Sequence, residues 1–236
     1  MGYYSFDFTY ILVLIGFVFS LIASGMVKST FSKYNKYYNS NGKTGAQVAE
    51  EILRANGIYD VKIQHISGSL TDNYNPTTNI VSLSDSTFNS SSVAAAGVAA
   101  HECGHVIQHH IGYAPIKLRN AIVPVASIGT KASYLFIMLG LIFSSGISQL
   151  LLNMGIIAFI AVVAFQVVTL PVELDASNRA LRILKKNNIL GESEVKMARK
   201  VLTAAAMTYV AAVATALLQL LRLIILFGGG RRRSKW

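Results

Sequence analysis

The feature that most constrains this chain is a run of forty-one residues without a charged side chain, from residue 132 to residue 172. A helix rises about 1.5 Å per residue and the hydrocarbon core of a bilayer is about 30 Å thick, so one crossing needs about 20 residues. The run is twice that length, and polar residues interrupt it around Gly146. It therefore predicts a transmembrane helical hairpin over 132–172 with its turn near Gly146.

Two further uncharged runs lie near the ends of the chain. Residues 8–27 predict a first transmembrane helix, and no Lys or Arg precedes them, as the n-region of a cleaved signal peptide would require. Residues 201–227 are uncharged apart from Arg222 and predict a fourth transmembrane helix or a re-entrant helix. With 53% hydrophobic and only 14% charged residues, the chain is expected to be an α-helical integral membrane protein with a small polar domain.

The basic residues predict the orientation in the membrane. They follow the first span, precede the hairpin and follow it again: Lys28, Lys33, Lys36, Lys43, Lys117, Arg119, Arg179, Arg182, Lys185 and Lys186. By the positive-inside rule these clusters face the cytoplasm of a multi-pass plasma-membrane protein. The basic tail 228–236 would then lie outside after a fourth crossing, which leaves a full crossing and a re-entrant helix both open. The net charge of +10 is spread between apolar runs, so it indicates bilayer contacts and no nucleic-acid partner.

A polar domain is expected between residues 31 and 119. Residues 44–56 have apolar side chains at helical spacing, and 61–66 and 79–84 have the β-branched composition of strands. Turn-forming residues from Asp72 to Pro76 separate the two strands. The Ala-rich stretch 90–111 predicts a second helix, which makes this a small α+β domain.

The second helix carries the motif H-E-x-x-H, with His101, Glu102 and His105. Residues four apart lie on one helix face, so both imidazoles can bind one Zn²⁺. Glu102 beside them is placed to act as general base toward an activated water. The motif predicts one zinc ion per chain and a peptide-hydrolysing enzyme.

A catalytic zinc needs a third protein ligand. The metzincin position, six residues after His105, is Ile111, so that class is excluded. His109 is collinear with the other two histidines along the helix and cannot easily converge with them. Glu173 is the better candidate, because the hairpin goes out and returns, which brings residue 173 to the same membrane face as the motif. We expect it on a helix over 173–200.

Three further candidate site residues follow Glu173 on the same expected helix. Asp175 is a candidate for orienting a ligating histidine, or else a solvated carboxylate, and Asn178 lies near it. Arg179 is a candidate for holding a substrate carbonyl, although a basic residue at a membrane face needs no such role.

Four stretches of the sequence resemble the YugP-like bacterial membrane zinc metallopeptidases. They are the segment LTDNYNP at 70–76, the strand IVSLS at 80–84, the motif HECGHVIQH at 101–109 and the segment LPVELDAS at 170–177. The resemblance covers nearly the whole chain and implies a membrane-embedded neutral zinc peptidase with a zincin-like domain, with His101 and His105 as ligands and Glu102 as base. It also implies that strand 80–84 is the sheet edge on which a substrate peptide would lie.

A more distant similarity is to the HtpX-type membrane gluzincins and the CAAX-processing enzymes, which share the order of motif, hairpin and Glu. In those proteins an Asp stands four residues after the ligating Glu, whereas Ser177 occupies that position here. The departure leaves Glu173 in place and puts an orienting role of Asp175 in doubt.

Two other functions remain open from the sequence. One is an intramembrane protease of the site-2 type with Asp175 as third ligand, favoured by Leu174-Asp175-Ala176 after Pro171. The other is a non-catalytic zinc-binding membrane scaffold that uses His65, His109 and His110. The leading prediction is a zinc endopeptidase acting on peptides or membrane proteins. Cys103 points elsewhere on the motif helix and is expected to pack.

Overall fold

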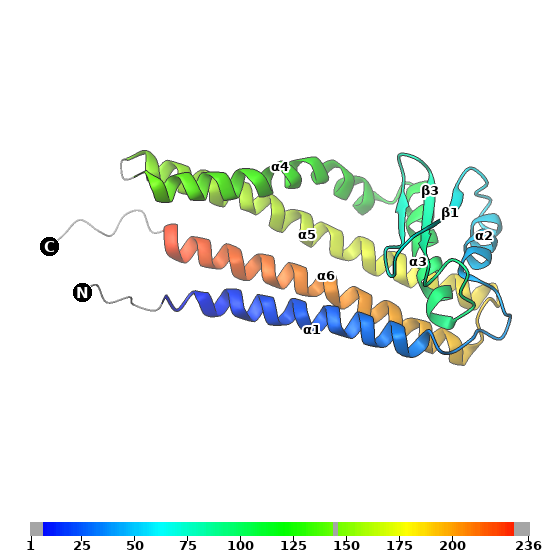
Figure 1. The fold of residues 1–236 in the computed structure, drawn as a ribbon. Coiled ribbons are helices and arrows are strands. Elements are labelled where there is room, and N and C mark those ends of the chain that lie inside the picture. Colours follow the sequence, from blue (N-terminus) through cyan, green and yellow to red (C-terminus); the bar gives the residue numbers. More distant parts are fainter. Residues whose placement is uncertain (1–6, 144–145, 229–236) are drawn as a thin grey trace. The chain divides into compact units, whose positions relative to one another are not determined.

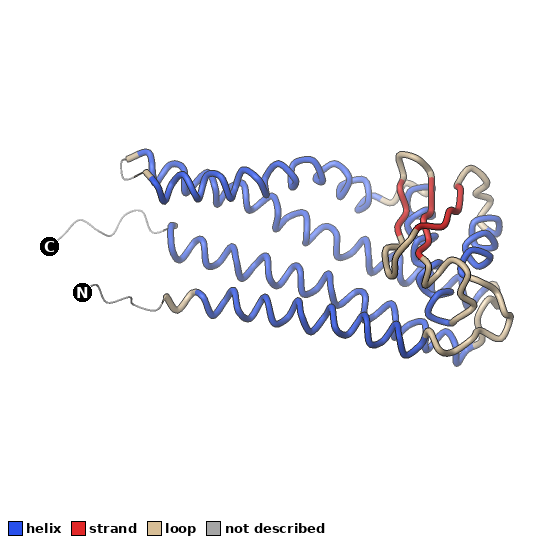
Figure 2. The backbone as a smooth tube through the Cα atoms, viewed as in Figure 1, coloured by secondary structure: helices blue, strands red, loops and turns tan. Residues whose placement is uncertain are grey.

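A computed structural model describes residues 7–143 and 146–228. Figure 1 labels its elements along the chain, and Figure 2 shows that helix dominates and that the strands are few and short. The elements are α1 (Tyr10–Tyr34), α2 (Gly45–Ala55), β1 (Lys62–Ile66), β2 (Asn73–Asn75), β3 (Ile80–Ser84), α3 (Val93–His110), α4 (Ala114–Ile142), α5 (Ile147–Lys186) and α6 (Glu192–Phe227). The chain forms two compact units, one from Met1–Ile22, Leu118–Leu170 and Tyr209–Trp236, the other from Ala23–Lys117 and Pro171–Thr208.

The first unit is built from apolar helical segments. Within the described ranges, four helices are long and apolar enough to cross a membrane, namely α1, α4, α5 and α6. Many of their large apolar side chains are exposed, as expected of surfaces that face lipid. The structure is thus a mostly helical protein with four candidate membrane-spanning helices.

Helices α1 and α6 run antiparallel within this unit. The Thr215 hydroxyl of α6 donates a hydrogen bond of 3.0 Å to the Gly16 carbonyl of α1. Nearer the N-terminus, Arg222 Nε donates to the Thr9 hydroxyl at 3.2 Å. Helix α6 is uninterrupted over 36 residues and is long and apolar enough to cross a membrane, and the full crossing and the re-entrant helix both stay predictions. Residues 229–236 of the predicted basic tail lie outside the described residues.

The hairpin turn falls where the sequence predicts it, with α4 ending at Ile142 and α5 beginning at Ile147, although residues 144 and 145 are outside the described part. The Ser148 hydroxyl donates to the Gly140 carbonyl at 2.6 Å across the two helices. Both helices extend beyond the uncharged run: α4 starts at Ala114, and α5 continues to Lys186 through Glu173.

The helix expected over 173–200 is therefore the end of one helix and the start of another. After Lys186 the backbone of Asn188 adopts a positive φ of 53°, a conformation that Asn tolerates better than most residues. The amides of Ile189 and Leu190 donate back to the Leu184 carbonyl, and both side chains are buried. This local cap ends α5 at Lys186, and the apolar periodicity alone does not reveal that end.

The second unit contains a three-stranded sheet among its described residues, in the order β1-β3-β2. β3 pairs parallel with β1 and antiparallel with β2. The expectation that strand 80–84 is a sheet edge is therefore wrong. The edge beside it is β2, in the Asn-rich segment that the sequence analysis assigned to a turn, because Asn has low strand propensity and tertiary pairing overrides it. The zincin-like character of this unit stays a prediction.

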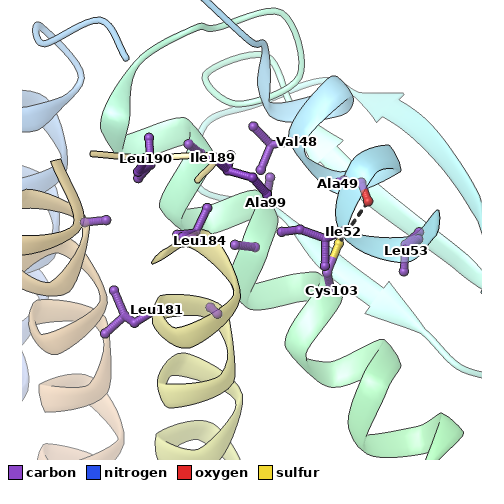
Figure 3. Close-up of a cluster of buried hydrophobic side chains, with 14 of the residues drawn as sticks. Val48, Ala49, Ile52, Leu53, Ala99, Cys103, Leu181, Leu184, Ile189 and Leu190 are labelled. Atoms are coloured by element: carbon purple, nitrogen blue, oxygen red, sulfur yellow. Dashed lines mark hydrogen bonds between the residues drawn. The ribbon is translucent and has the colours of Figure 1, made fainter. Parts of the chain in front are cut away.

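An apolar cluster holds α2, α3 and the α5–α6 turn together in this unit. In Figure 3, Ile52 of α2 lies beside Cys103 of α3, and Leu184 and Ile189 point toward Ala99. The Cys103 thiol lies 3.6 Å from the Ala49 carbonyl, which it reaches as a weak donor. Cys103 is fully buried in this cluster, in agreement with the packing role expected for it.

Two glycines of α3 face other helices at different distances. A Cβ at Gly104 would lie 2.6 Å from the Ala176 carbonyl oxygen of α5, too close for any real contact. A Cβ at Gly97 would lie 3.4 Å from the Ala198 methyl of α6, which is van der Waals contact. The absence of a side chain at Gly104 thus lets α3 and α5 approach closely.

We expect Gly104→Ala to destabilise the protein by about 1–3 kcal/mol, because a backbone oxygen cannot move aside as a side chain can. Gly97→Ala is the matched control: it is expected to be neutral or stabilising, since Ala favours a helix interior by up to about 1 kcal/mol. Thermal unfolding in detergent measures both. Equal melting temperatures for the two variants would contradict the close approach at Gly104.

Candidate metal centre

The two motif histidines lie on α3, whose start and packing are set locally. The Ser92 hydroxyl caps the helix by accepting from the Ala95 amide at 3.0 Å. The alanines that follow are fully buried, so α3 lies inside the second unit. One helical turn separates His101 from His105, and their ring centroids are 4.8 Å apart, edge to face.

Helix α5 brings Glu173 to these rings. Glu173 Oε2 lies 3.3 Å from His101 Nε2 and 3.4 Å from His105 Nε2. The Glu173 side chain is 4% exposed, and among the described residues Oε2 has no hydrogen-bond partner. A buried carboxylate oxygen without a partner is costly, so this position calls for a cation.

The three side chains fit a zinc ion. One ligand atom from each of His101, His105 and Glu173 lies within 4.8 Å of the others, and the described residues contain this group as a possible metal site. Two atoms bound about 2.1 Å from a tetrahedral Zn²⁺ are about 3.4 Å apart, as the Nε2 and Oε2 atoms are here. Two imidazoles and one carboxylate are also the donor set of several catalytic zinc sites.

Glu102 is buried beside this group. Burial raises the pKa of its carboxyl above the ordinary value, the neighbouring His101 and His105 oppose that shift, and the carboxylates of Asp72 and Glu173 add to it. Asp72 is held by Ser84, whose amide donates to one carboxylate oxygen at 2.8 Å and whose hydroxyl donates to the other at 3.0 Å. A carboxyl that holds a proton more readily than usual suits proton transfer.

The Nδ1 atoms of both histidines have hydrogen-bond partners that the sequence analysis missed. His101 Nδ1 lies 3.0 Å from the Ser177 hydroxyl, and His105 Nδ1 lies 3.1 Å from Gln108 Oε1. The available signal was spacing, since Gln108 is three residues after His105 and Ser177 is four after Glu173, each on the same helix face. Ser177 of α5 thus contacts a histidine of α3.

The residues after Glu173 have different surroundings. Asp175 Oδ2 accepts hydrogen bonds from Gln108 Nε2, at 2.8 Å, and from Arg179 Nε. Asp175 therefore reaches His105 only through Gln108, and it is not part of the group of converging ligand atoms. Arg179 also lies over the Tyr113 ring. Asn178 is exposed, and its carbonyl accepts from Arg182.

The remaining histidines lie outside the group of possible ligands. His65 pairs with Asp85 at 2.6 Å, His109 packs edge to face on Tyr74, and His110 is exposed. A scaffold would use these three residues, but within the described residues none of them belongs to a group of three or more potential metal ligands.

Comparisons with known proteins agree with this site. The family described as "Putative neutral zinc metallopeptidase" matches residues 9–228. A relative from Bacillus subtilis (strain 168), "Putative membrane protease YugP", is 42% identical over 212 residues, which cover 90% of this chain and 93% of the relative. No solved structure matches the chain. Because the family match spans nearly the whole chain and includes both motif histidines and Glu173, the chain belongs to this neutral zinc metallopeptidase family.

Proposed function

We propose that this protein is a zinc-dependent endopeptidase of the membrane, with His101, His105 and Glu173 holding one Zn²⁺ per chain and Glu102 as general base. The observation that carries the proposal is the convergence of two Nε2 atoms on a buried, unpartnered Glu173 oxygen, next to a buried Glu102. The engagement of Asp175 by Gln108 and Arg179 counts against the site-2 reading, in which Asp175 is the third ligand.

The residues divide the chemistry among them. When bound, Zn²⁺ supplies Lewis acidity toward a water and a peptide carbonyl. Glu102 takes a proton from the attacking water while the oxygen of that water bonds to the carbonyl carbon. Glu102 later gives the proton to the amine nitrogen as the C–N bond breaks. The proton taken from the water ends on the product amine and the OH on the product carboxyl group, so Glu102 ends each cycle as a carboxylate. Ser177 and Gln108 keep the two rings oriented.

The substrate and the location follow from the surroundings of the site. The protein is a membrane protein by its four apolar helices and its relative, and the site residues share a unit with Lys28, Lys33, Lys36 and Lys117. The four apolar helices give four proposed crossings of the plasma membrane, and the positive-inside rule assigns the site to the cytoplasmic face. Peptides or membrane proteins are the proposed substrates, and the bilayer is the proposed partner.

Removal of the metal tests the proposal. Purified protein in detergent is expected to contain about one zinc per chain and to cleave a labelled unfolded protein, because three protein ligands leave one position open for chemistry. A chelator is expected to abolish cleavage, and added Zn²⁺ is expected to restore it. Metal content by mass spectrometry and fluorescence of the released fragments are the measurements. Cleavage that persists in protein shown to be free of metal contradicts the proposal.

A further inference from the structure

Gln108 connects the two helices that carry the proposed ligands. Its side chain is fully buried between α3 and α5. The carbonyl Oε1 lies 3.1 Å from His105 Nδ1, and the amide Nε2 donates to the Val172 carbonyl and to Asp175 Oδ2, each at 2.8 Å. Every polar atom of this side chain therefore has a partner.

The chemistry of these partners sets the direction of each hydrogen bond. A backbone carbonyl and a carboxylate can only accept, so the amide nitrogen of Gln108 must face Val172 and Asp175. Its oxygen must then face His105. Because a carbonyl oxygen cannot donate, the hydrogen lies on His105 Nδ1, and in the neutral ring the lone pair is on Nε2. That Nε2 atom is the one directed at Glu173, 3.4 Å away.

We infer that Gln108 is a positioning residue that holds His105 in the tautomer needed to bind the metal, an inference that rests on the proposed zinc site. Asp175 holds the Gln108 amide in turn, and Arg179 holds Asp175. The Arg179 guanidinium lies 5.4 Å from the centre of the Tyr113 ring, and the Tyr113 amide donates to the Gln108 backbone carbonyl at 2.9 Å. The contacts thus close a loop that begins and ends at Gln108.

His101 has no such constraint. Its Nδ1 faces the Ser177 hydroxyl, which can donate or accept by rotating. Ser177 therefore orients the ring without choosing its tautomer. The two histidines are predicted to differ: the metal-free protein holds His105 in one tautomer and leaves the tautomer of His101 open.

Gln108→Met tests the inference, since Met has a similar length and makes none of the three hydrogen bonds. In metal-free protein, at a pH high enough for the His105 ring to be neutral, nitrogen NMR is expected to show His105 as the Nδ1–H tautomer in the wild type and as a mixture in the variant. The zinc Kd of the variant, measured by competition with a chelator, is expected to rise about 10–100-fold. Val106→Ala, at a buried residue of α3 in the apolar cluster, is the packing control and should keep both the tautomer and the Kd.

A second pair of variants tests the direction of the hydrogen bonds and serves if Gln108→Met does not fold. Gln108→Glu places a second carboxylate beside that of Asp175. The two negative charges repel each other, so zinc binding is expected to weaken. Adding Asp175→Asn supplies an amide that can donate to the new carboxylate and accept from Arg179, so the double variant is expected to recover part of the loss. No recovery would contradict the inferred direction.

The outcomes separate this inference from the proposed function. A wild type that binds no zinc overturns the zinc site itself. A wild type that binds zinc, with Gln108→Met unchanged in tautomer and Kd, overturns only the role of Gln108. Equal losses in Gln108→Met and Val106→Ala overturn it as well, because they indicate packing alone.

Discussion

Glu102→Gln is expected to lower the rate of peptide hydrolysis by about 10²–10⁴-fold, the usual contribution of a general acid–base group. The amide cannot take a proton from water at neutral pH, yet it has nearly the same shape and leaves His101, His105 and Glu173 in place. Zinc content is therefore expected to stay at about one per chain. Initial rates on a labelled peptide, with metal content measured on the same sample, check both parts.

The matched control is Glu50→Gln, on the exposed side of α2 where Glu50 pairs with Arg54. It makes the same chemical change outside the metal site and is expected to leave the rate unaltered. If Glu102→Gln retained full activity, Glu102 would not be the base. A protein with zinc but no hydrolysis in the wild type would support the scaffold reading instead.

Glu173→Ala is expected to weaken zinc binding by more than about 100-fold, which exceeds the effect usual for residues that only support a ligand. The variant removes the oxygen on which both Nε2 atoms converge. Glu173→Gln keeps the buried volume while removing the charge, and it is expected to lose zinc too, which separates loss of a ligand from loss of packing. Zinc content after dialysis against a buffer of set free zinc measures the effect.

Asp175→Ala is the discriminating comparison for Glu173. It leaves the ligand atoms of His101, His105 and Glu173 intact and removes a carboxylate that acts through Gln108. The loss of zinc affinity is therefore expected to be smaller than in Glu173→Ala, and the variant is expected to bind about one zinc per chain at saturation. The reverse pattern, with zinc retained in Glu173→Ala and lost in Asp175→Ala, would make Asp175 the third ligand and favour the site-2 type. Size-exclusion profiles show whether each variant is folded.

Much of the candidate site could be predicted from spacing and topology. The four-residue interval of His101 and His105 depends only on helix period, and the structure has both rings on one face of α3. The approach of Glu173 was inferred from a hairpin that leaves and returns, and the structure brings its oxygen within 3.4 Å of both rings. Both inferences depend on properties of contiguous residues, namely the period of a helix and the length of an apolar run.

Other parts depended on contacts between distant segments. Strand β2 forms in an Asn-rich stretch because it pairs with β3, and β3 is central because β1 pairs with its other side. The end of α5 depends on a positive φ at Asn188 and on burial of Ile189. Strand propensity and apolar periodicity describe single segments, so neither could reveal these features.

The sequence by itself determined where the apolar spans lie and which helix carries the metal-binding motif, because transfer of apolar side chains to lipid and the period of a helix are properties of contiguous residues. Only the tertiary structure decided which polar atoms meet at the site. Gly104 lets α3 approach the Ala176 carbonyl of α5, and that approach places Ser177 against His101 and Val172 and Asp175 against Gln108. Hydrogen bonds between helices depend on ångström-scale approach, which packing sets and no periodicity encodes.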